Sequence, residues 1–86
     1  MTSKKYVIKN TIGLHARPAA LFVKKAAEFE SKIKVVKEDK EADAKSIISI
    51  MALGAVKGAE IVINANGDDS DSAVDALVEL LDSFAE

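Results

Sequence analysis

The chain has 86 residues, 49% of them apolar and 30% charged, with a net charge of −2, which fits one globular domain over residues 1–86. It contains no cysteine and one histidine, which excludes disulfides and thiol catalysis and leads us to expect no metal site and no resident cofactor. No apolar run approaches the roughly 20 residues of a membrane span. No signal-peptide pattern opens the chain, so we expect a cytoplasmic protein without membrane insertion.

Seven elements are predicted along the chain, in the order βαββαβα. Alternating or β-branched runs predict strands, and apolar residues repeating at i, i+3 and i+4 predict helices. The predicted strands cover residues 4–9, 32–37, a short edge segment within 38–43, and 59–67. The predicted helices cover residues 16–27, 46–54 and 68–84. This order favours an α+β domain in which helices cover one face of a mainly antiparallel sheet.

The segment SIISIMALG, residues 46–54, is ambiguous between a strand and a helix. Its three isoleucines favour a strand. Ser46 is a good N-cap residue, however, and Gly54 is a good residue just beyond a helix end. We therefore predict a short helix.

Charge is divided unevenly along the sequence. Residues 1–57 contain all 12 basic residues, whereas residues 58–86 contain eight acidic residues and no basic one. This division predicts a positive face that meets an acidic partner or a phosphate. The alternative is that the two parts neutralise each other within the fold, and both interpretations can hold together.

The stretch IGLHARPAA contains the only histidine, the only arginine and the only proline of the chain. Pro18 lacks an N–H group and fits only in the first turn of a helix, so the helix is predicted to start near residue 16. His15 then falls at or just before the N-cap. Gly13 allows the preceding turn a backbone shape that other residues resist. Proline also disfavours the helical region at Arg17, so an irregular first turn is expected.

This placement has a chemical consequence for His15. A positive helix end and Arg17 both disfavour imidazolium, so a neutral ring with a free lone pair is expected. Free N–H groups and a guanidinium would receive an anion acquired by that ring. The arrangement predicts a phosphoryl acceptor, and without a second acid/base group it predicts a carrier rather than an enzyme. The plainer alternative is a solvated histidine at a helix start.

Two segments resemble the signature sequences of a known family. GLHARPAA around His15 and KSIISIMALG around Ser46 are similar to those of HPr, the histidine-containing phosphocarriers of the bacterial sugar phosphotransferase system. The likeness runs from about residue 4 to residue 84. It implies an open-faced β-sandwich, with four antiparallel strands in the order 1-4-2-3 and three helices on one face.

The resemblance also implies roles for the residues of the first segment. His15 would carry phosphate on Nδ1, accept it from enzyme I and donate it to the IIA domains of sugar permeases. Arg17 would stabilise the phosphoryl group, and the backbone amides of Ala16 and Arg17 would bind its oxygens. Such a carrier is expected to be a monomer, because its site must be open to successive partners.

Ser46 has two interpretations, which are compatible. As a plain N-cap it stabilises its helix by about 1 kcal/mol. The resemblance adds phosphorylation of Ser46 by an ATP-dependent HPr kinase/phosphorylase. The new charge would weaken docking to enzyme I and recruit a transcriptional regulator of carbon catabolite repression.

The apolar run after Ser46 cannot all face inward in so short a helix. Either most of its residues belong to the core, or part of the run forms an exposed docking surface. The resemblance favours Ile47, Ile48 and Met51 as a patch that docks enzyme I and IIA. It also makes Lys24 a candidate contact for an acidic partner, although a solvated helix face explains Lys24 equally well.

Two positions depart from the usual family pattern, since Ile48 and Ala20 are often Met and Thr in relatives. These two departures leave undetermined which partners the protein binds. A regulatory protein acting only through Ser46 is a second hypothesis, and the presence of His15 argues against it. A carrier of a nitrogen-linked branch is a third, disfavoured by Ser46. A nucleic-acid module is the outside option, and the single arginine, the few aromatic residues and the acidic last third argue against it.

Overall fold

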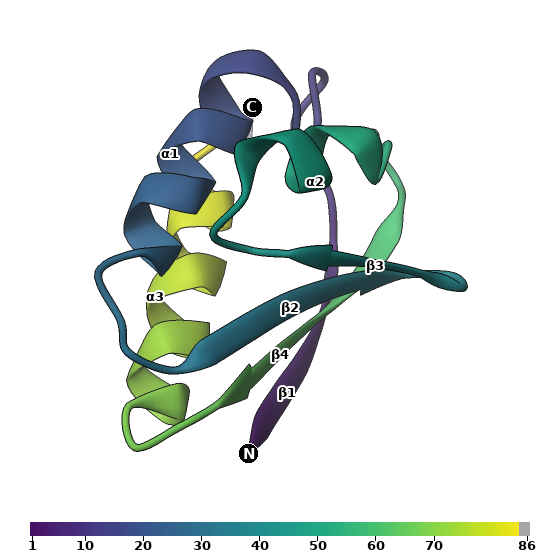
Figure 1. Cartoon of the computed structure of the whole chain (residues 1–86). Helices are drawn as coiled ribbons and strands as arrows, with labels where there is room; N and C mark the ends of the chain where they lie inside the picture. The colour runs from purple at the N-terminus through teal and green to yellow at the C-terminus, as the bar shows by residue number, and fades with distance from the viewer. Residues whose placement is uncertain (85–86) are drawn as a thin grey trace.

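The computed structural model describes residues 1–84 and contains a single four-stranded antiparallel sheet in the order β1-β4-β2-β3. The strands are β1 (Thr2–Val7), β2 (Lys32–Lys37), β3 (Lys40–Asp43) and β4 (Glu60–Asn66). The helices are α1 (Ala16–Ala26), α2 (Ile47–Ala52) and α3 (Ser70–Ser83). All three helices lie on one side of the sheet and leave the other side open (Figure 1). The predicted element order, strand order and α+β class are confirmed.

The core lies between the sheet and the helices and follows the periodicity of the sequence. Alternate strand residues point into it because successive side chains of a strand face opposite sides. Helix residues that are three and four positions apart form the other side of the core, facing the sheet. The fully buried large side chains include Ile8, Phe22, Ile33, Val35, Ile50, Ile61, Ile63 and Leu77. Burying each such side chain contributes roughly 1.5–3 kcal/mol to folding.

The first strand begins and ends two residues earlier than the sequence pattern predicts. Thr2 pairs with Ala65 of β4, so the polar residues at the start of the chain already belong to the ladder between β1 and β4. Regular pairing stops at Val7, but the chain remains bonded at Ile8. The Ile8 N–H donates to the Ala59 carbonyl at 2.9 Å, and the Ile8 carbonyl accepts from Gly58 at 2.8 Å.

A carboxylate joins the segment after β4 to the connection between α1 and β2. Asp69 accepts hydrogen bonds from the backbone N–H groups of Glu30 and Ser31, at 2.9 and 3.0 Å, and from the Ser31 hydroxyl. The Ser31 hydroxyl and the Glu30 N–H favour the charged form and lower the pKa of Asp69 below its usual 3.8. Asp69 therefore ties two loops that are distant in the sequence.

A second polar contact fastens the edge strand β1 to α3. The Tyr6 hydroxyl donates to Asp82 at 2.8 Å, and the Lys9 ammonium lies 3.1 Å from the same oxygen. Burial, and then the Asp82 carboxylate, raise the pKa of Tyr6 to about 12. The Tyr6 hydroxyl and Lys9 lower the pKa of Asp82. The Lys9 pair joins a base of the first part of the chain to an acid of the last part, so some internal neutralisation does occur.

Candidate functional site

His15 is the N-cap residue of α1 and is exposed. Its backbone is extended, with φ −138° and ψ 157°, and its imidazole makes no capping hydrogen bond to the helix. Arg17 is also exposed, within the first turn, and that turn contains no acidic residue. The helix start therefore offers an accessible ring, unopposed N–H groups and a guanidinium within three residues, which is a site suited to an anion.

The irregular start expected for this helix appears at Ala16. Its φ is +52°, in the left-handed region, where an L-residue other than glycine, asparagine or aspartate is uncommon. This conformation costs about 1–2 kcal/mol. Strain at such a position is retained only where the surrounding structure holds it, and the neighbouring loop provides that support.

The loop before His15 is braced by backbone contacts to the segment after α2. The Leu14 N–H donates to the Ala55 carbonyl at 2.9 Å, and Leu14 is buried. Within the loop, the buried Asn10 side chain donates to the Gly13 carbonyl at 3.1 Å. Gly13 has φ +72°, and a Cβ there would stand 2.2 Å from the Ala55 oxygen. Glycine is thus required at residue 13 twice over, by its φ and by the close approach.

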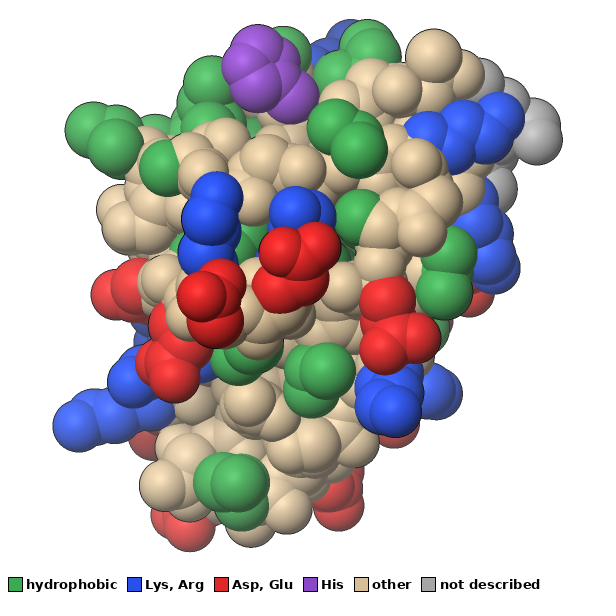
Figure 2. All heavy atoms as spheres, turned by 90° about the vertical axis from the view of Figure 1, so that its right-hand side faces the viewer, with side chains coloured by type: hydrophobic (Ala, Val, Ile, Leu, Met, Phe, Trp, Pro, Cys, Tyr) green, Lys and Arg blue, Asp and Glu red, His purple; other side chains and the backbone are tan. Residues whose placement is uncertain are grey.

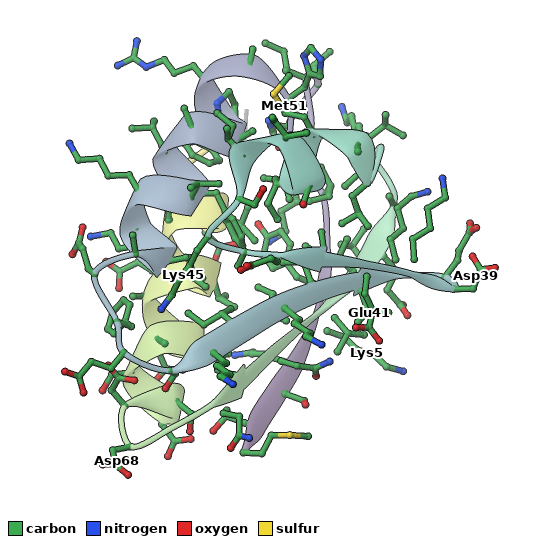
Figure 3. The ribbon with its side chains drawn as sticks, in the orientation of Figure 1. Lys5, Asp39, Glu41, Lys45, Met51 and Asp68 are labelled. Carbon is green, nitrogen blue, oxygen red and sulfur yellow. The ribbon has the colours of Figure 1, made fainter. Side chains whose placement is uncertain are left out.

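Ser46 is the N-cap of α2, as predicted, and is half-buried. Its hydroxyl accepts a hydrogen bond from the Ser49 N–H at 3.3 Å. The side chain of Lys45 turns away from the helix toward the connection between α1 and β2 (Figure 3), where its ammonium donates to the Phe29 carbonyl at 2.7 Å. Lys45 therefore links two loops, a role that the sequence does not indicate.

The apolar run in α2 divides between the core and the surface. Ile50 and Leu53 are buried, whereas Ile48 is 79% exposed and Ile47 is 39% exposed. Met51 lies between these extremes, packs on the core and points to the end of the molecule where α1 begins (Figure 3). α1 and α2 contact each other, so α2 lies beside the helix that His15 precedes. We call Ile47, Ile48 and Met51 the α2 patch.

The lysines that follow His15 on α1 differ in their surroundings. Lys24 is exposed. Lys25 lies 3.5 Å from Glu28, which follows the end of α1, and the two form an ion pair. Such exposed pairs contribute little to stability. Lys24 is therefore the better candidate for a partner contact.

Comparison with known proteins identifies the family. A family model described as "PTS HPr component phosphorylation site" matches residues 2–83. The phosphocarrier protein HPr of Vibrio cholerae is 44% identical over 84 residues, which are 98% of this chain and 99% of that protein. The chain belongs to the HPr family. An HPr is a phosphocarrier of the phosphotransferase system (PTS) and not a catalytic enzyme.

Solved HPr-family structures share this fold and include dimers. HPr of Thermoanaerobacter tengcongensis is 49% identical, covers 100% of this chain and 98% of its own, and superposes with a TM-score of 0.96. The same protein is also solved as a dimer, with 100% of both chains covered and a TM-score of 0.79. Bacillus subtilis Crh, a catabolite repression protein, is 35% identical over 100% of this chain and 99% of its own. It is described as a dimer with a swapped domain, at a TM-score of 0.77.

Two exposed apolar residues near the HPr-family site are absent from the sequence prediction. Ile12 is 57% exposed and Val56 is 59% exposed, and their loops meet at Gly13. An isoleucine inside the turn NTIG is the only local signal, because the contact with residue 56 spans more than 40 residues. Figure 2 shows hydrophobic side chains on both sides of the histidine.

Among residues 1–84, no three His, Asp or Glu side chains come together so that they could hold a metal ion. None of the helices within that range is long and apolar enough to cross a membrane.

Proposed function

We propose that this chain, as one HPr-like domain over residues 1–86, accepts a phosphoryl group on His15 from phosphorylated enzyme I. It then donates the group to the IIA domains of sugar permeases. The observation that carries this proposal is the exposed His15 at the N-cap of α1, with Arg17 in the first turn. The family supports the phosphocarrier class, and this geometry supports His15 as the acceptor.

The transfer moves one phosphoryl group from a donor atom to His15. The lone pair on Nδ1 of His15 attacks phosphorus while the bond between phosphorus and the donor atom breaks, and that bonding electron pair returns to the donor atom. The proton of the neutral His15 ring stays on Nε2. The Ala16 and Arg17 amides receive the phosphate oxygens, and the Arg17 guanidinium balances their charge. Catalysis of this kind depends on positioning and charge stabilisation.

We also propose that Ser46 is a regulatory phosphorylation site, used by an ATP-dependent HPr kinase/phosphorylase and read by a transcriptional regulator of catabolite repression. The Ser46 side chain already caps α2, and a phosphate there keeps acceptor oxygens for the Ser49 N–H. The fold would tolerate the modification. The new charge would stand beside the α2 patch and weaken apolar docking there.

The working form is proposed to be a cytoplasmic monomer, because His15 must meet two kinds of partner in turn. The dimers of T. tengcongensis HPr and of Crh make a dimer the alternative assembly. Sedimentation at concentrations from micromolar to millimolar distinguishes the two. A dimer at micromolar concentration would contradict the proposal.

The deciding experiment is phosphorylation with enzyme I, phosphoenolpyruvate and Mg²⁺, followed by ³¹P NMR and intact mass. We expect one acid-labile phosphate on Nδ1, absent in His15→Ala. Transfer through Arg17→Lys is expected to be slower, because lysine loses the bidentate contact. An unlabelled His15, with Ser46 still labelled by the kinase and ATP, would refute the carrier role and favour a purely regulatory protein.

A further inference from the structure

We propose that the open side of the sheet holds a binding site for a small organic phosphate that also carries hydroxyl groups. The site is a hollow of about 310 Å³ whose walls include Lys32, Lys34, Glu41, Asn64 and Asn66. It lies over β2 and β4, on the side of the sheet that the helices leave uncovered (Figure 1). We call it the open-face hollow. The phosphocarrier role uses none of these residues, so the inference is independent of the proposed function.

Strand register brings four polar side chains of the open-face hollow onto one face. Lys32 stands opposite Asn66, and Lys34 stands opposite Asn64, in the antiparallel pair of β2 and β4. Buried residues alternate with these four along each strand, so all four side chains lie on the open side. Opposite Cβ atoms are about 5 Å apart, and same-face neighbours along a strand are about 7 Å apart. The two ammonium groups and the two amides therefore surround an area that one small molecule can span.

The amide of Asn64 is oriented by its neighbour on β1. The Ser3 hydroxyl donates a hydrogen bond to Oδ1 of Asn64. Since the oxygen and the nitrogen of an amide point in different directions, Nδ2 is turned away from Ser3 and toward β2. Within residues 1–84, Nδ2 of Asn64 donates to no protein acceptor. Its N–H groups are thus available to a ligand in the open-face hollow.

The lysines give the open-face hollow a positive charge. The Lys34 ammonium lies 3.3 Å from the Glu41 carboxylate, and both side chains are well exposed. Such an exposed pair is weak, so Lys34 can turn to a ligand. Figure 3 shows Glu41 on the side of β3 that faces away from the helices. Lys32 has no acidic group within ion-pair distance in the described part of the chain, so the walls carry one uncompensated positive charge.

A phosphate ester fits these groups better than a carboxylate does. Near pH 7 a phosphate monoester carries a charge of about −1.5 to −2 and three acceptor oxygens, so it can contact both ammonium groups at once. Lysine binds phosphate as a point charge and needs no fixed orientation. The side chain of Asn66 has both donors and an acceptor, which suits the hydroxyl groups of the ligand. The volume is at the lower end of the roughly 300–1,000 Å³ typical of small-molecule sites, which leaves room for an organic part.

The test is a titration of the ¹⁵N-labelled protein followed by ¹H–¹⁵N NMR. The probes are ribose 5-phosphate, ribose, inorganic phosphate and succinate, each used alone. Ribose 5-phosphate should shift the amides of residues 32–34 and 64–66 with a Kd of about 1 mM, the affinity that its roughly 14 non-hydrogen atoms give at an ordinary ligand efficiency. The other three probes should bind there at least about fivefold more weakly. Inorganic phosphate bound at the start of α1 is distinguished because it shifts residues 15–17 instead.

A charge-removing variant and its matched control locate the ligand. Lys32→Gln should raise the Kd for ribose 5-phosphate about fivefold, the upper end of the effect of one exposed charge. Lys40→Gln removes the same charge from β3, but its side chain lies on the other side of the sheet from Glu41. It should leave the Kd unchanged. Thermal unfolding checks that both variants keep the fold.

Four results would overturn the inference. The first is the absence of shifts at residues 32–34 and 64–66 up to about 20 mM ribose 5-phosphate, twenty times the expected Kd. The second is equal binding of ribose or inorganic phosphate, because the phosphate and hydroxyl contacts would then not act together. The third is tighter binding of succinate, which would assign the hollow to carboxylates. The fourth is an unchanged Kd in Lys32→Gln. Phosphorylation of His15 by enzyme I is measured separately, so none of these results bears on the proposed function.

Discussion

Substitution of Gly13 tests whether the backbone contact between the loops positions His15. In Gly13→Ala the new Cβ would lie 2.2 Å from the Ala55 oxygen and 2.9 Å from the Val56 Cα, so the loop must move by about 1 Å. The residue also keeps φ +72°, which costs about 1–2 kcal/mol. Loss of the Leu14 to Ala55 hydrogen bond adds about 1 kcal/mol. The stiffer unfolded chain offsets about 0.4–1 kcal/mol of this loss, so a net loss of about 1–2.6 kcal/mol is expected.

A matched control separates overlap from backbone strain. Gly54 has φ +70°, and a Cβ there meets nothing within 4 Å. Gly54→Ala therefore carries the strain without the overlap and should lose only about 1 kcal/mol. Urea unfolding at pH 7 measures both variants. The rate of His15 phosphorylation at saturating enzyme I should fall at least tenfold in Gly13→Ala and stay near wild type in Gly54→Ala.

Equal results for the two alanine variants would refute this reasoning. If both lose the same stability and keep the same rate, the loop yields without cost and the Ala55 contact does not position His15. If Gly13→Ala loses stability but transfers phosphate normally, the contact supports the fold alone.

Three further predictions concern groups away from His15. Absorbance titration of Tyr6, the only tyrosine, should show phenolate forming near pH 12 in the wild type and at lower pH in Asp82→Asn. The contribution of Tyr6 to stability is full below pH 10 and is lost between pH 10 and 12. A phenolate midpoint near pH 10 in the wild type would contradict the contact with Asp82. Because its pKa is lowered, Asp69 stabilises the fold above its usual 3.8, and this contribution disappears as the pH falls through the folded value. The stability gap between wild type and Asp69→Asn should therefore shrink from pH 7 to pH 3 in urea unfolding, and a constant gap would refute the assignment. Ser46→Ala should lose about 1 kcal/mol of stability in urea unfolding, and an unchanged midpoint would show that the cap is dispensable.

Local chemistry made much of this fold predictable. Pro18 could only stand in a first turn, and it placed the start of α1 and the N-cap position of His15 correctly. Ser46 and Gly54 likewise marked a short helix against the strand preference of three isoleucines. Alternation in β4 identified its buried face. These features depend on neighbours within about four residues, which a sequence pattern contains.

Contacts between segments that are distant in the sequence could not be predicted from such local patterns. The close approach of Gly13 to residue 55, the exposure of Val56 and the bond from Lys45 to Phe29 all depend on how separate loops meet. The division of the apolar run in α2 between core and surface could be predicted only in part. Its length showed that some apolar residues must face outward, but only packing against α1 and β3 decides which ones do.

If both proposed phosphorylations occur, the arrangement of the two helices accounts for their different effects. His15 and Ser46 both occupy N-caps, of α1 and α2, and the two helices contact each other. A phosphate on His15 would lie at the centre of the proposed docking area and would be passed on. A phosphate on Ser46 would lie beside the α2 patch, where it would cap α2. The same group at the starts of two helices in contact would thus give transfer in one position and obstruction in the other, because the proposed docking requires a dry apolar contact beside His15.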